Sequence, residues 1–310
     1  MKKFILNIVK FLGFLIPSYI ILLFIWSFFM PQFMAKNVRN KIASYGHLFT
    51  RVQEIKTHKN PDILFIGSSH SYRGFDPRVF SKMGYTTFNL GSSSQSPINS
   101  KALLHQYLTE INPKFVVYEI CGETLETDGV ESSLDLLSNN KIDENAFEMA
   151  ISLNNIRTYN TLIYNYLRQK IGFNKFVSEP KKQNGNQYIS GGYVESKYSK
   201  NPLHEEKKGK WNLIEKEIDI LKENISFLKK NKIPFILVQT PISKKMYESK
   251  TNNKETEMLL SKLGKFKNFQ GEIPLNDTID FYDSNHLNQE AVVKFNLKFI
   301  EYLKTQNIKF

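Results

Sequence analysis

The feature that most constrains this 310-residue sequence is a short apolar run, Ile63 to Ile66, which stops abruptly at Gly67-Ser68-Ser69. Consecutive apolar residues are typical of a parallel strand that helices cover on both faces. Gly67 lets the backbone turn sharply where the strand leaves the sheet. We therefore expect Ser69 at the carboxyl edge of a sheet, where ligands of open α/β folds bind. The same residues also suit an ordinary strand-to-loop junction.

An acid and a histidine three residues apart, Asp283 and His286, precede a helical pattern near the other end of the chain. A serine hydroxyl is a poor nucleophile unless a base lies within hydrogen-bond reach, and the base needs an acceptor that fixes its tautomer. Ser69, His286 and Asp283 can fill these three roles. Taken alone, His286 also fits a surface or capping residue.

The two blocks together, Gly67-Ser68-Ser69 and Asp283-x-x-His286, resemble those of the SGNH (GDSL-like) hydrolase and acyltransferase superfamily over roughly residues 61–305. The resemblance implies a three-layer, flavodoxin-like α/β sandwich in which Ser69 is the nucleophile, His286 the base and Asp283 its partner. Ser68 replaces the family's aspartate, as it does in membrane-anchored members that transfer D-alanyl groups to teichoic acids. The chain also resembles the polysaccharide O-acetyltransferases of this superfamily.

The resemblance also implies an oxyanion hole. The family's second block is a glycine after the second strand, matched here by Gly91, whose N–H would join that of Ser69. The third block is poorly kept, because Thr124 stands where the family has an asparagine. Arg73 is a candidate for binding an anionic substrate group near Ser69, and a salt bridge that fixes its loop is the alternative.

Strands alternate with helices along the rest of the chain, which predicts a parallel sheet of about five strands wound by helices. Asp76 and Pro77 are expected to begin a helix as its cap and first residue. Beyond the first strand, the patterns predict strands at 86–90, 115–121, 234–241 and 279–282, and helices at 99–111, 211–231, 255–263 and 289–303. The region from about 124 to 210 is the least regular, with a helical pattern at 145–171. This region is either an insertion that forms a lid over the site or an ordinary surface loop region.

The amino-terminal region contains a charge-free run, Phe11 to Phe29, which is long enough to cross a hydrocarbon core of about 30 Å. A cleaved signal peptide is less consistent with the length of this run and with the absence of a small-x-small cleavage pattern. We expect a retained signal anchor in residues 1–33, a juxtamembrane helix or stalk in 34–60 and the folded domain in 61–310. The stalk pattern rests on apolar residues at helical spacing: Val38, Ile42, Tyr45, Phe49 and Val52. Lysines and arginines are balanced on the two flanks, so charge does not orient the span.

The formal net charge is +12. The sequence has no arginine-rich stripe with interleaved aromatic residues, the pattern that would favour a nucleic-acid partner. The positive charge fits a surface facing anionic lipid or an acidic envelope polymer. Cys121 is the only cysteine, which excludes an intrachain disulfide and a cysteine-based zinc site. No phosphate loop, dinucleotide fingerprint or paired metal-ligand spacing occurs, so no cofactor and no metal is expected.

Two functions remain open at this stage. The first is a membrane-anchored serine esterase or O-acyltransferase whose domain lies outside the cytoplasmic membrane. The resemblance implies a cell-envelope polysaccharide or teichoic-acid-like acceptor, and possible cooperation with a membrane-spanning O-acyltransferase. The second is a non-catalytic protein of the same fold that assembles or binds carriers in envelope acylation, which the weakened third block favours.

Overall fold

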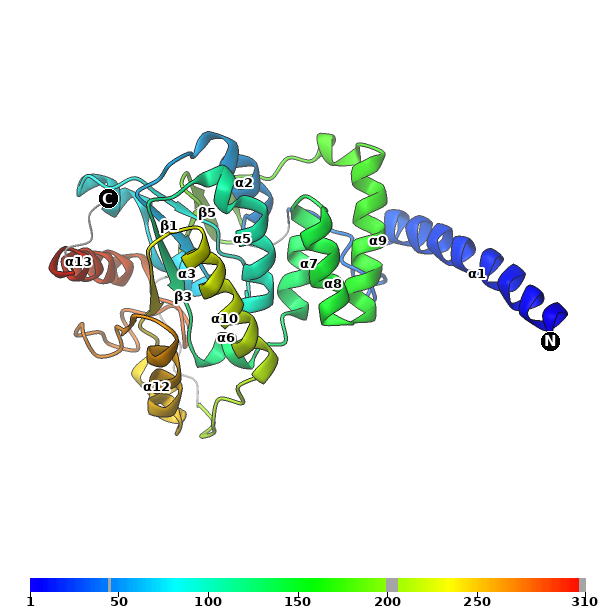
Figure 1. The fold of residues 1–310 in the computed structure, drawn as a ribbon. Coiled ribbons are helices and arrows are strands. Elements are labelled where there is room, and N and C mark those ends of the chain that lie inside the picture. The colour runs from blue at the N-terminus through cyan, green and yellow to red at the C-terminus, as the bar shows by residue number, and fades with distance from the viewer. Residues whose placement is uncertain (44–45, 199–205, 307–310) are drawn as a thin grey trace.

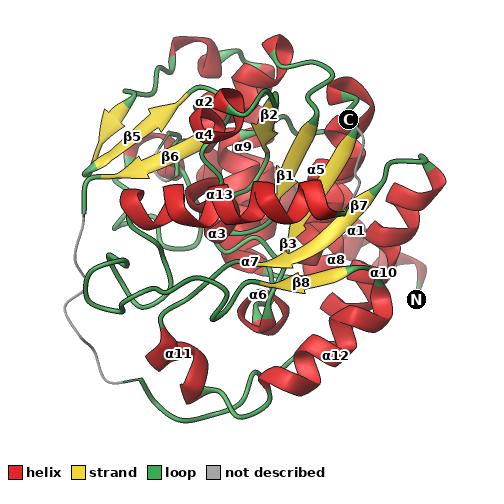
Figure 2. Ribbon diagram, turned by 90° about the vertical axis from the view of Figure 1, so that its left-hand side faces the viewer, coloured by secondary structure: helices red, strands yellow, loops and turns green. Residues whose placement is uncertain are grey.

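A parallel five-stranded sheet forms the centre of the folded body in the computed structural model, which describes residues 1–43, 46–198 and 206–306. The strands lie in the order β2-β1-β3-β7-β8, with every neighbouring pair parallel (Figure 2). This order is that of flavodoxin-like sheets, and the chain reverses direction across the sheet between β1 and β3. The strand bounds are β1 Ile63–Ile66, β2 Thr87–Asn89, β3 Phe115–Glu119, β7 Phe235–Gln239 and β8 Phe266–Asn268.

Helices cover both faces of the sheet, as the uninterrupted apolar strands require. Residues that alternate along each strand fall into two separate cores, because successive side chains point to opposite faces. Leu64 and Ile66 pack with α5 (Pro97–Ile111) and α10 (Glu215–Lys230) on one face. On the other face, Phe65 packs with α4 (Pro77–Lys82) and α13 (Gln289–Thr305), the helix that crosses in front of the strands in Figure 2. The three-layer α/β fold expected from the sequence is confirmed.

Most of the expected elements appear within a few residues of their predicted ends, but the fifth strand does not. Residues 279–282 form no strand, and Phe281 makes only an isolated antiparallel bridge to Leu287. The fifth strand is β8, whose three residues are all half-buried at the edge of the sheet. An edge strand carries too few apolar residues to stand out from a loop in sequence, whereas 279–282 looks apolar because Phe281 fills the core under α13.

The insertion consists of a helical part and a small antiparallel sheet. Asn145–Ile171, expected as one helical pattern, is split into α8 (Glu144–Leu153) and α9 (Ile156–Lys170). The second sheet, β4-β5-β6, packs through β6 against α3 (Ser69–Gly74). Residues 199–205 of the insertion lie outside the described residues. The remaining elements are α6 Gly122–Glu126, α7 Val130–Asn139, η2 Phe173–Phe176, β4 Lys182–Gln183, β5 Asn186–Ile189, β6 Tyr193–Ser196, α11 Lys244–Ser249 and α12 Asn253–Leu263.

Among the described residues, one helix, α1 (Lys2–Phe29), is long and apolar enough to cross a membrane, and it projects from the body beside α9 (Figure 1). Its amino-terminal part is exposed on every side. Near its end it meets α9, where the Tyr19 hydroxyl donates to Asn160 Oδ1 at 2.6 Å and the Phe24 ring packs on Tyr164. The helix thus combines a free apolar part with a part held against the domain.

The segment after α1 differs from the expected stalk, because it packs into the folded body. Within the described part of this segment, α2 (Leu48–Glu54) and η1 (Ile55–Thr57) are the helical elements, and Leu48, Val52 and Ile55 belong to the α5 side of the core. Tyr45, part of the stalk pattern, lies outside the described residues. Of the residues whose spacing suggested a stalk, Phe49 and Val52 lie on α2, and Val38 and Ile42 are buried in the segment before it.

Arg51, on α2, is fully buried and ties three distant segments together. Its guanidinium donates to the carbonyls of Gly46, Gly91 and Gly192 at 2.8, 2.9 and 2.9 Å. Those carbonyls belong to the segment after α1, the loop after β2 and the insertion. A buried cation that meets three carbonyls in this way fixes their relative positions.

Candidate active site

Ser69 stands where the sequence analysis expects it, directly after β1 at the carboxyl edge of the sheet and at the start of α3. Ser68 is the cap of this helix, and its Oγ accepts from the His70 N–H at 3.2 Å. The Ser69 side chain remains half-exposed, while Ser68, His70 and Ser71 around it are buried. Among these neighbours, Ser69 is therefore the serine that a substrate can reach.

The structure brings Ser69, His286 and Asp283 together. His286 Nε2 lies 2.7 Å from Ser69 Oγ, and His286 Nδ1 lies 2.8 Å from Asp283 Oδ2. The Asp283 Oδ1 atom also accepts from the His286 backbone N–H at 2.7 Å, which fixes the carboxylate against the loop that carries the histidine. A carboxylate on Nδ1 selects the tautomer whose Nε2 can take a proton from the serine.

Burial lowers the pKa of His286, and the nearby cations His70 and Arg73 lower it further, against the opposing effect of Asp283. The imidazole is therefore neutral at neutral pH, which is the form that acts as a base. For Asp283, burial alone would raise the pKa, but hydrogen bonds from His286 and from the backbone of Asn285 and His286 outweigh it and lower the pKa. Asp283 is thus an anion beside a neutral histidine.

A second histidine, His70, lies behind the first, with the two ring centres 5.1 Å apart. Burial would lower the pKa of His70, but Cys121 and Glu119 outweigh burial and raise the pKa well above its usual value. Its Nδ1 is 3.7 Å from Glu119 Oε1, and both side chains are almost fully buried. His70 is accordingly a buried cation paired with a buried carboxylate.

Glu119 also holds the turn that presents Ser69. Its Oε2 atom accepts from the Ser68 N–H at 2.9 Å and from the Ser68 hydroxyl at 2.8 Å. Gly67 adopts φ +147°, and a Cβ there would lie 2.6 to 2.7 Å from atoms of Glu119. Only glycine therefore allows the carboxylate to approach the turn so closely. Sequence reasoning missed Glu119, although a charged residue ending an otherwise apolar strand was a usable signal.

Two of the three expected oxyanion donors are engaged elsewhere. The Gly91 N–H donates to Asn89 Oδ1 at 2.9 Å. The Thr124 hydroxyl accepts from the Cys121 N–H at 3.0 Å and donates to the Cys121 carbonyl at 2.8 Å, so it caps its own helix. The third expected donor is the backbone N–H of Ser69. It lies in the first turn of α3, where N–H groups have no carbonyl partner within the helix. Sequence reasoning did not identify Asn89 as the acceptor for the Gly91 N–H, because this hydrogen bond depends on the conformation of the loop after β2.

Arg73 lies beside the histidine, and the structure connects it to the insertion. Its Nη1 donates to Asn186 Oδ1 on β5 at 2.9 Å. The guanidinium carbon lies 5.3 Å from the ring centre of Tyr72 and 5.9 Å from that of Tyr282. These contacts hold the Arg73 side chain in place, as in the alternative that Arg73 fixes its own loop and does not bind substrate. They also show that the insertion reaches the rim of the site.

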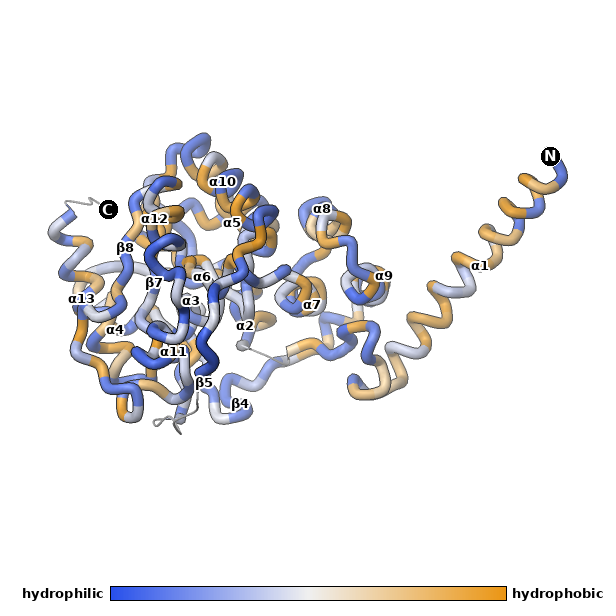
Figure 3. The backbone as a smooth tube through the Cα atoms, turned by 90° about the horizontal axis from the view of Figure 1, so that it is seen from below, coloured by the Kyte–Doolittle hydropathy of each residue, from blue (hydrophilic) through white to orange (hydrophobic). Residues whose placement is uncertain are grey.

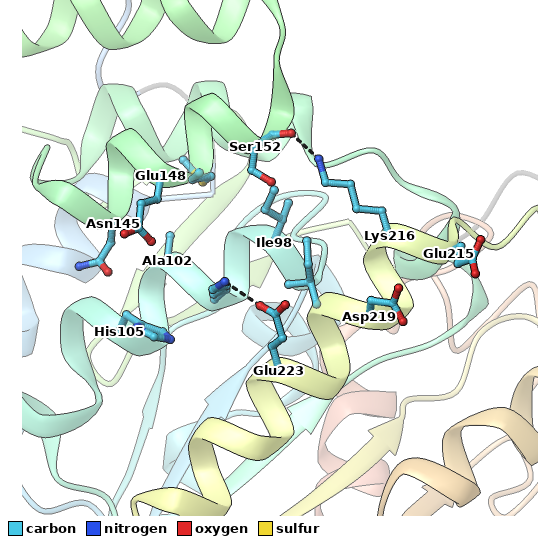
Figure 4. Close-up of a pocket in the computed structure, with 13 residues that line it drawn as sticks. Ile98, Ala102, His105, Asn145, Glu148, Ser152, Glu215, Lys216, Asp219 and Glu223 are labelled. Atoms are coloured by element: carbon cyan, nitrogen blue, oxygen red, sulfur yellow. Dashed lines mark hydrogen bonds and ion pairs between the residues drawn. The ribbon is translucent and has the colours of Figure 1, made fainter.

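Two cavities bear on where a ligand can sit. A cavity of about 10 Å³, the size of one water molecule, lies beside His286 among residues that include His70, Arg73 and Thr240. A much larger cavity of about 460 Å³ lies between α5, α8 and α10 (Figure 4). Lys101 and Glu223 form an ion pair across it, and its lining includes none of the residues of the Ser69 site. The large cavity is therefore separate from the serine and its base.

A metal-binding group is suggested by distance alone. Among the described residues, potential ligand atoms of His70, Cys121 and Glu123 lie within 4.8 Å of one another. A histidine must be neutral to bind a metal, and His70 is held in its charged form by Glu119. Burial also raises the pKa of the Cys121 thiol, whereas a metal needs the thiolate. Binding of a metal there would therefore require both His70 and Cys121 to release a proton.

Comparisons with known proteins give a limited result. No protein-family model matches this chain, and no curated protein matches it. The structure is similar to that of a putative acylhydrolase from Bacteroides fragilis, with 12% identity, a TM-score of 0.42 and coverage of 84% of this chain and 98% of the other. It is also similar to a GDSL-like lipase from Bacteroides thetaiotaomicron, with 12% identity, a TM-score of 0.36 and coverage of 84% and 99%.

Proposed function

We propose that this chain is a membrane-anchored serine esterase or O-acyltransferase of the SGNH type. The observation that carries the proposal is the hydrogen-bonded series from Ser69 Oγ through His286 to Asp283, at 2.7 and 2.8 Å. A half-exposed serine bound to a neutral histidine, itself bound to an anionic carboxylate, is the arrangement that activates a hydroxyl for attack on an acyl carbonyl.

The chemistry proceeds in two halves. Ser69 Oγ attacks the acyl carbonyl while His286 Nε2 takes its proton, and Asp283 stabilises the imidazolium that forms. The Ser69 N–H faces the developing oxyanion as a donor. Collapse breaks the bond to the leaving alcohol, which takes the proton from His286, and leaves an acyl-Ser69 ester. A water molecule or an acceptor hydroxyl then attacks this ester, with His286 again acting as base, and releases Ser69.

The acceptor and location form the finer part of the proposal. We propose that the domain faces the outside of the cytoplasmic membrane and that acyl-Ser69 passes its group to an envelope polysaccharide or a teichoic-acid-like polymer. The apolar α1 and the net charge of +12 support this, because an anchor confines the serine near membrane-bound acceptors and a basic protein attracts anionic polymers. A membrane-spanning O-acyltransferase is the proposed donor partner.

One observation favours a second function, a non-catalytic carrier-binding protein of the same fold. Gly91 and Thr124, expected as oxyanion donors, use their polar groups within the protein. Such a protein would keep the serine and histidine without efficient turnover, because each missing donor in an oxyanion hole costs about a hundredfold or more in rate.

A fluorophosphonate probe distinguishes the two functions in the full-length chain. We expect covalent labelling of the wild type, and loss of labelling by about a thousandfold or more in Ser69→Ala and His286→Ala. Ser284→Ala, a half-buried serine in the loop of Asp283, serves as the matched control and should label normally. Absence of labelling in the folded wild type would favour the carrier-binding function.

Two cellular experiments test the finer proposal. Protease added to intact spheroplasts should digest the domain, and digestion only after lysis would contradict the outward location. Deletion of the protein, or Ser69→Ala, should remove an O-acyl modification from the envelope. If envelope acylation were unchanged while a soluble ester was turned over rapidly, plain esterase activity would replace acyl transfer.

A further inference from the structure

The length of α1 conflicts with a domain that stands clear of the membrane. The charge-free run Phe11–Phe29 is about 28 Å long as a helix, just enough to cross a hydrocarbon core of about 30 Å. Shifting the span toward the amino terminus would carry the Lys10 ammonium into the hydrocarbon, where a charged side chain is unfavourable. The apolar run therefore needs nearly its whole length inside the membrane.

The last part of that run is held against α9. Residues Ile20, Leu23, Phe24 and Ser27 recur at helical spacing and are the residues of this part that lose exposure. Phe28 also packs on Phe173, just beyond α9, with ring centres 5.3 Å apart. Because α9 packs against the carboxyl-terminal half of this run, α9 and its ends cannot stand clear of the membrane and must lie in the head-group region of the leaflet that α1 leaves. Figure 3 shows the apolar α1 extending from the α9 side of the body.

The elements around this contact carry many exposed apolar side chains. Outside α1, most of the strongly exposed large hydrophobic residues in the described chain belong to the segment just after α1 or to α8, α9 and η2. They are Phe33, Met34, Phe147, Ile151, Ile156, Ile171, Phe173 and Phe176. A soluble surface seldom concentrates such residues, whereas a membrane interface accommodates them.

Positive charge lies next to these residues. A cavity of about 700 Å³ opens beside the end of α1, and Lys36, Arg39, Lys41 and Arg157 line it together with Gln32, Asn37 and Asn184. Its lining residues in the described chain include no carboxylate. Three of these cations lie on the segment that follows α1 and the fourth, Arg157, lies on α9; together they complement the phosphates of anionic phospholipids.

We propose that the domain is seated directly on the membrane through α9, with the exposed side chains at its ends in the interface and the cation cavity over anionic phospholipid head groups. The occupant is the lipid of the leaflet that α1 leaves. This inference rests on the proposed membrane anchoring by α1 and not on the proposed acyl chemistry. It replaces a flexible tether with a fixed orientation of the domain on the bilayer.

An environment-sensitive fluorophore on single introduced cysteines tests the seating in the full-length chain reconstituted in liposomes. Cys121 is buried, so labelled wild type measures the background. Phe176→Cys reports on the proposed interface, and Met258→Cys, 57% exposed on α12, is the matched control on another face. Leu22→Cys, on the exposed side of α1, reports whether the helix is inserted. We expect a blue shift and quenching by doxyl-labelled lipid at positions 22 and 176 but not at 258.

The second arm tests the lipid charge. Phosphatidylglycerol added to phosphatidylcholine should increase quenching at position 176, and Lys36→Gln with Arg157→Gln should abolish that increase. Lys229→Gln with Lys230→Gln, an equal loss of charge at exposed residues on α10, should preserve it. Equal water exposure at positions 176 and 258 would overturn the seating, as would a water-exposed label at position 22. Quenching that is independent of phosphatidylglycerol would overturn the role of the cation cavity.

Discussion

Replacement of Glu119 with glutamine tests whether the buried carboxylate behind Ser69 controls the base of the proposed reaction. Glu119 lies 3.7 Å from His70 Nδ1 and is the anion that opposes the buried charge of that histidine. Glutamine keeps the size of the side chain and an acceptor for Ser68, but it removes the negative charge. We expect His70 to lose its proton in this variant, because a buried imidazolium without a counterion is unfavourable.

The size of the effect on His286 follows from the distance between the rings. Two unit charges at the 5.1 Å separation of the His70 and His286 ring centres interact by about 3 kcal/mol at an effective dielectric constant of about 20. This energy corresponds to about two pKa units. Because the His286 side chain is 15% exposed, screening reduces the expected change to about one unit. Loss of a neighbouring positive charge raises the pKa of His286.

The rate of fluorophosphonate labelling, measured from acidic to alkaline pH, reports this change. Only neutral His286 activates Ser69, so labelling rises with pH through the pKa of His286, which in the wild type lies below the ordinary 6.5. In Glu119→Gln the profile should move to higher pH by about one unit, with the largest loss at acidic pH. Glu217→Gln is the control, since Glu217 is equally buried but does not act on His286.

His70→Gln provides an independent variant that removes the positive charge directly and leaves Glu119 in place. Its profile should move in the same direction. The remaining groups that act on His286 are Asp283 and Arg73, and both variants leave them unchanged. An unshifted profile in both folded variants, or a shift to lower pH, would refute the proposed coupling.

Three further changes test the rest of the site. Asp283→Asn should lower labelling by about a thousandfold, because the carboxylate that fixes and stabilises His286 is lost, and a rate near that of the wild type would remove Asp283 from the series. Arg51→Met leaves three carbonyls without their buried donor and should lower the free energy of unfolding by about 3 kcal/mol or more, seen as a fall in Tm. An unchanged Tm would show that water replaces the guanidinium. Gly67→Ala places a Cβ against Glu119 and should cost about 2 kcal/mol or more together with slower labelling, whereas normal labelling and Tm would show that the turn yields.

Sequence reasoning succeeded where the chemistry and the local pattern agree. The run Ile63–Ile66 could be identified as a strand because its burial on both faces makes every residue apolar. Asp283 and His286 are three residues apart, so one loop sets their geometry and the spacing alone indicates that they act together. That Ser69, His286 and Asp283 are catalytic residues stays a prediction, which the labelling experiments test.

The failures came from contacts between distant parts of the chain. β8 was missed because an edge strand needs few apolar residues, and Phe281 suggested a strand because it is buried under a helix. Nothing local to Arg51 indicates that its partners would be three carbonyls from separate segments. Likewise, the expected donors Gly91 and Thr124 could not be evaluated without knowing which acceptors lie beside them.

The hydrogen bond between Ser69 and His286 joins residues that are 217 positions apart, near the beginning and the end of the sequence of the folded domain. Contacts of such long sequence separation form late, because the intervening chain must first be ordered. During synthesis the serine therefore exists for most of the time as an ordinary alcohol without a base. The proposed reactivity arises only when the last helix packs against the sheet, so a truncated or partly folded chain carries an inert hydroxyl. The amount of probe bound at Ser69 would then measure the fraction of fully folded chains.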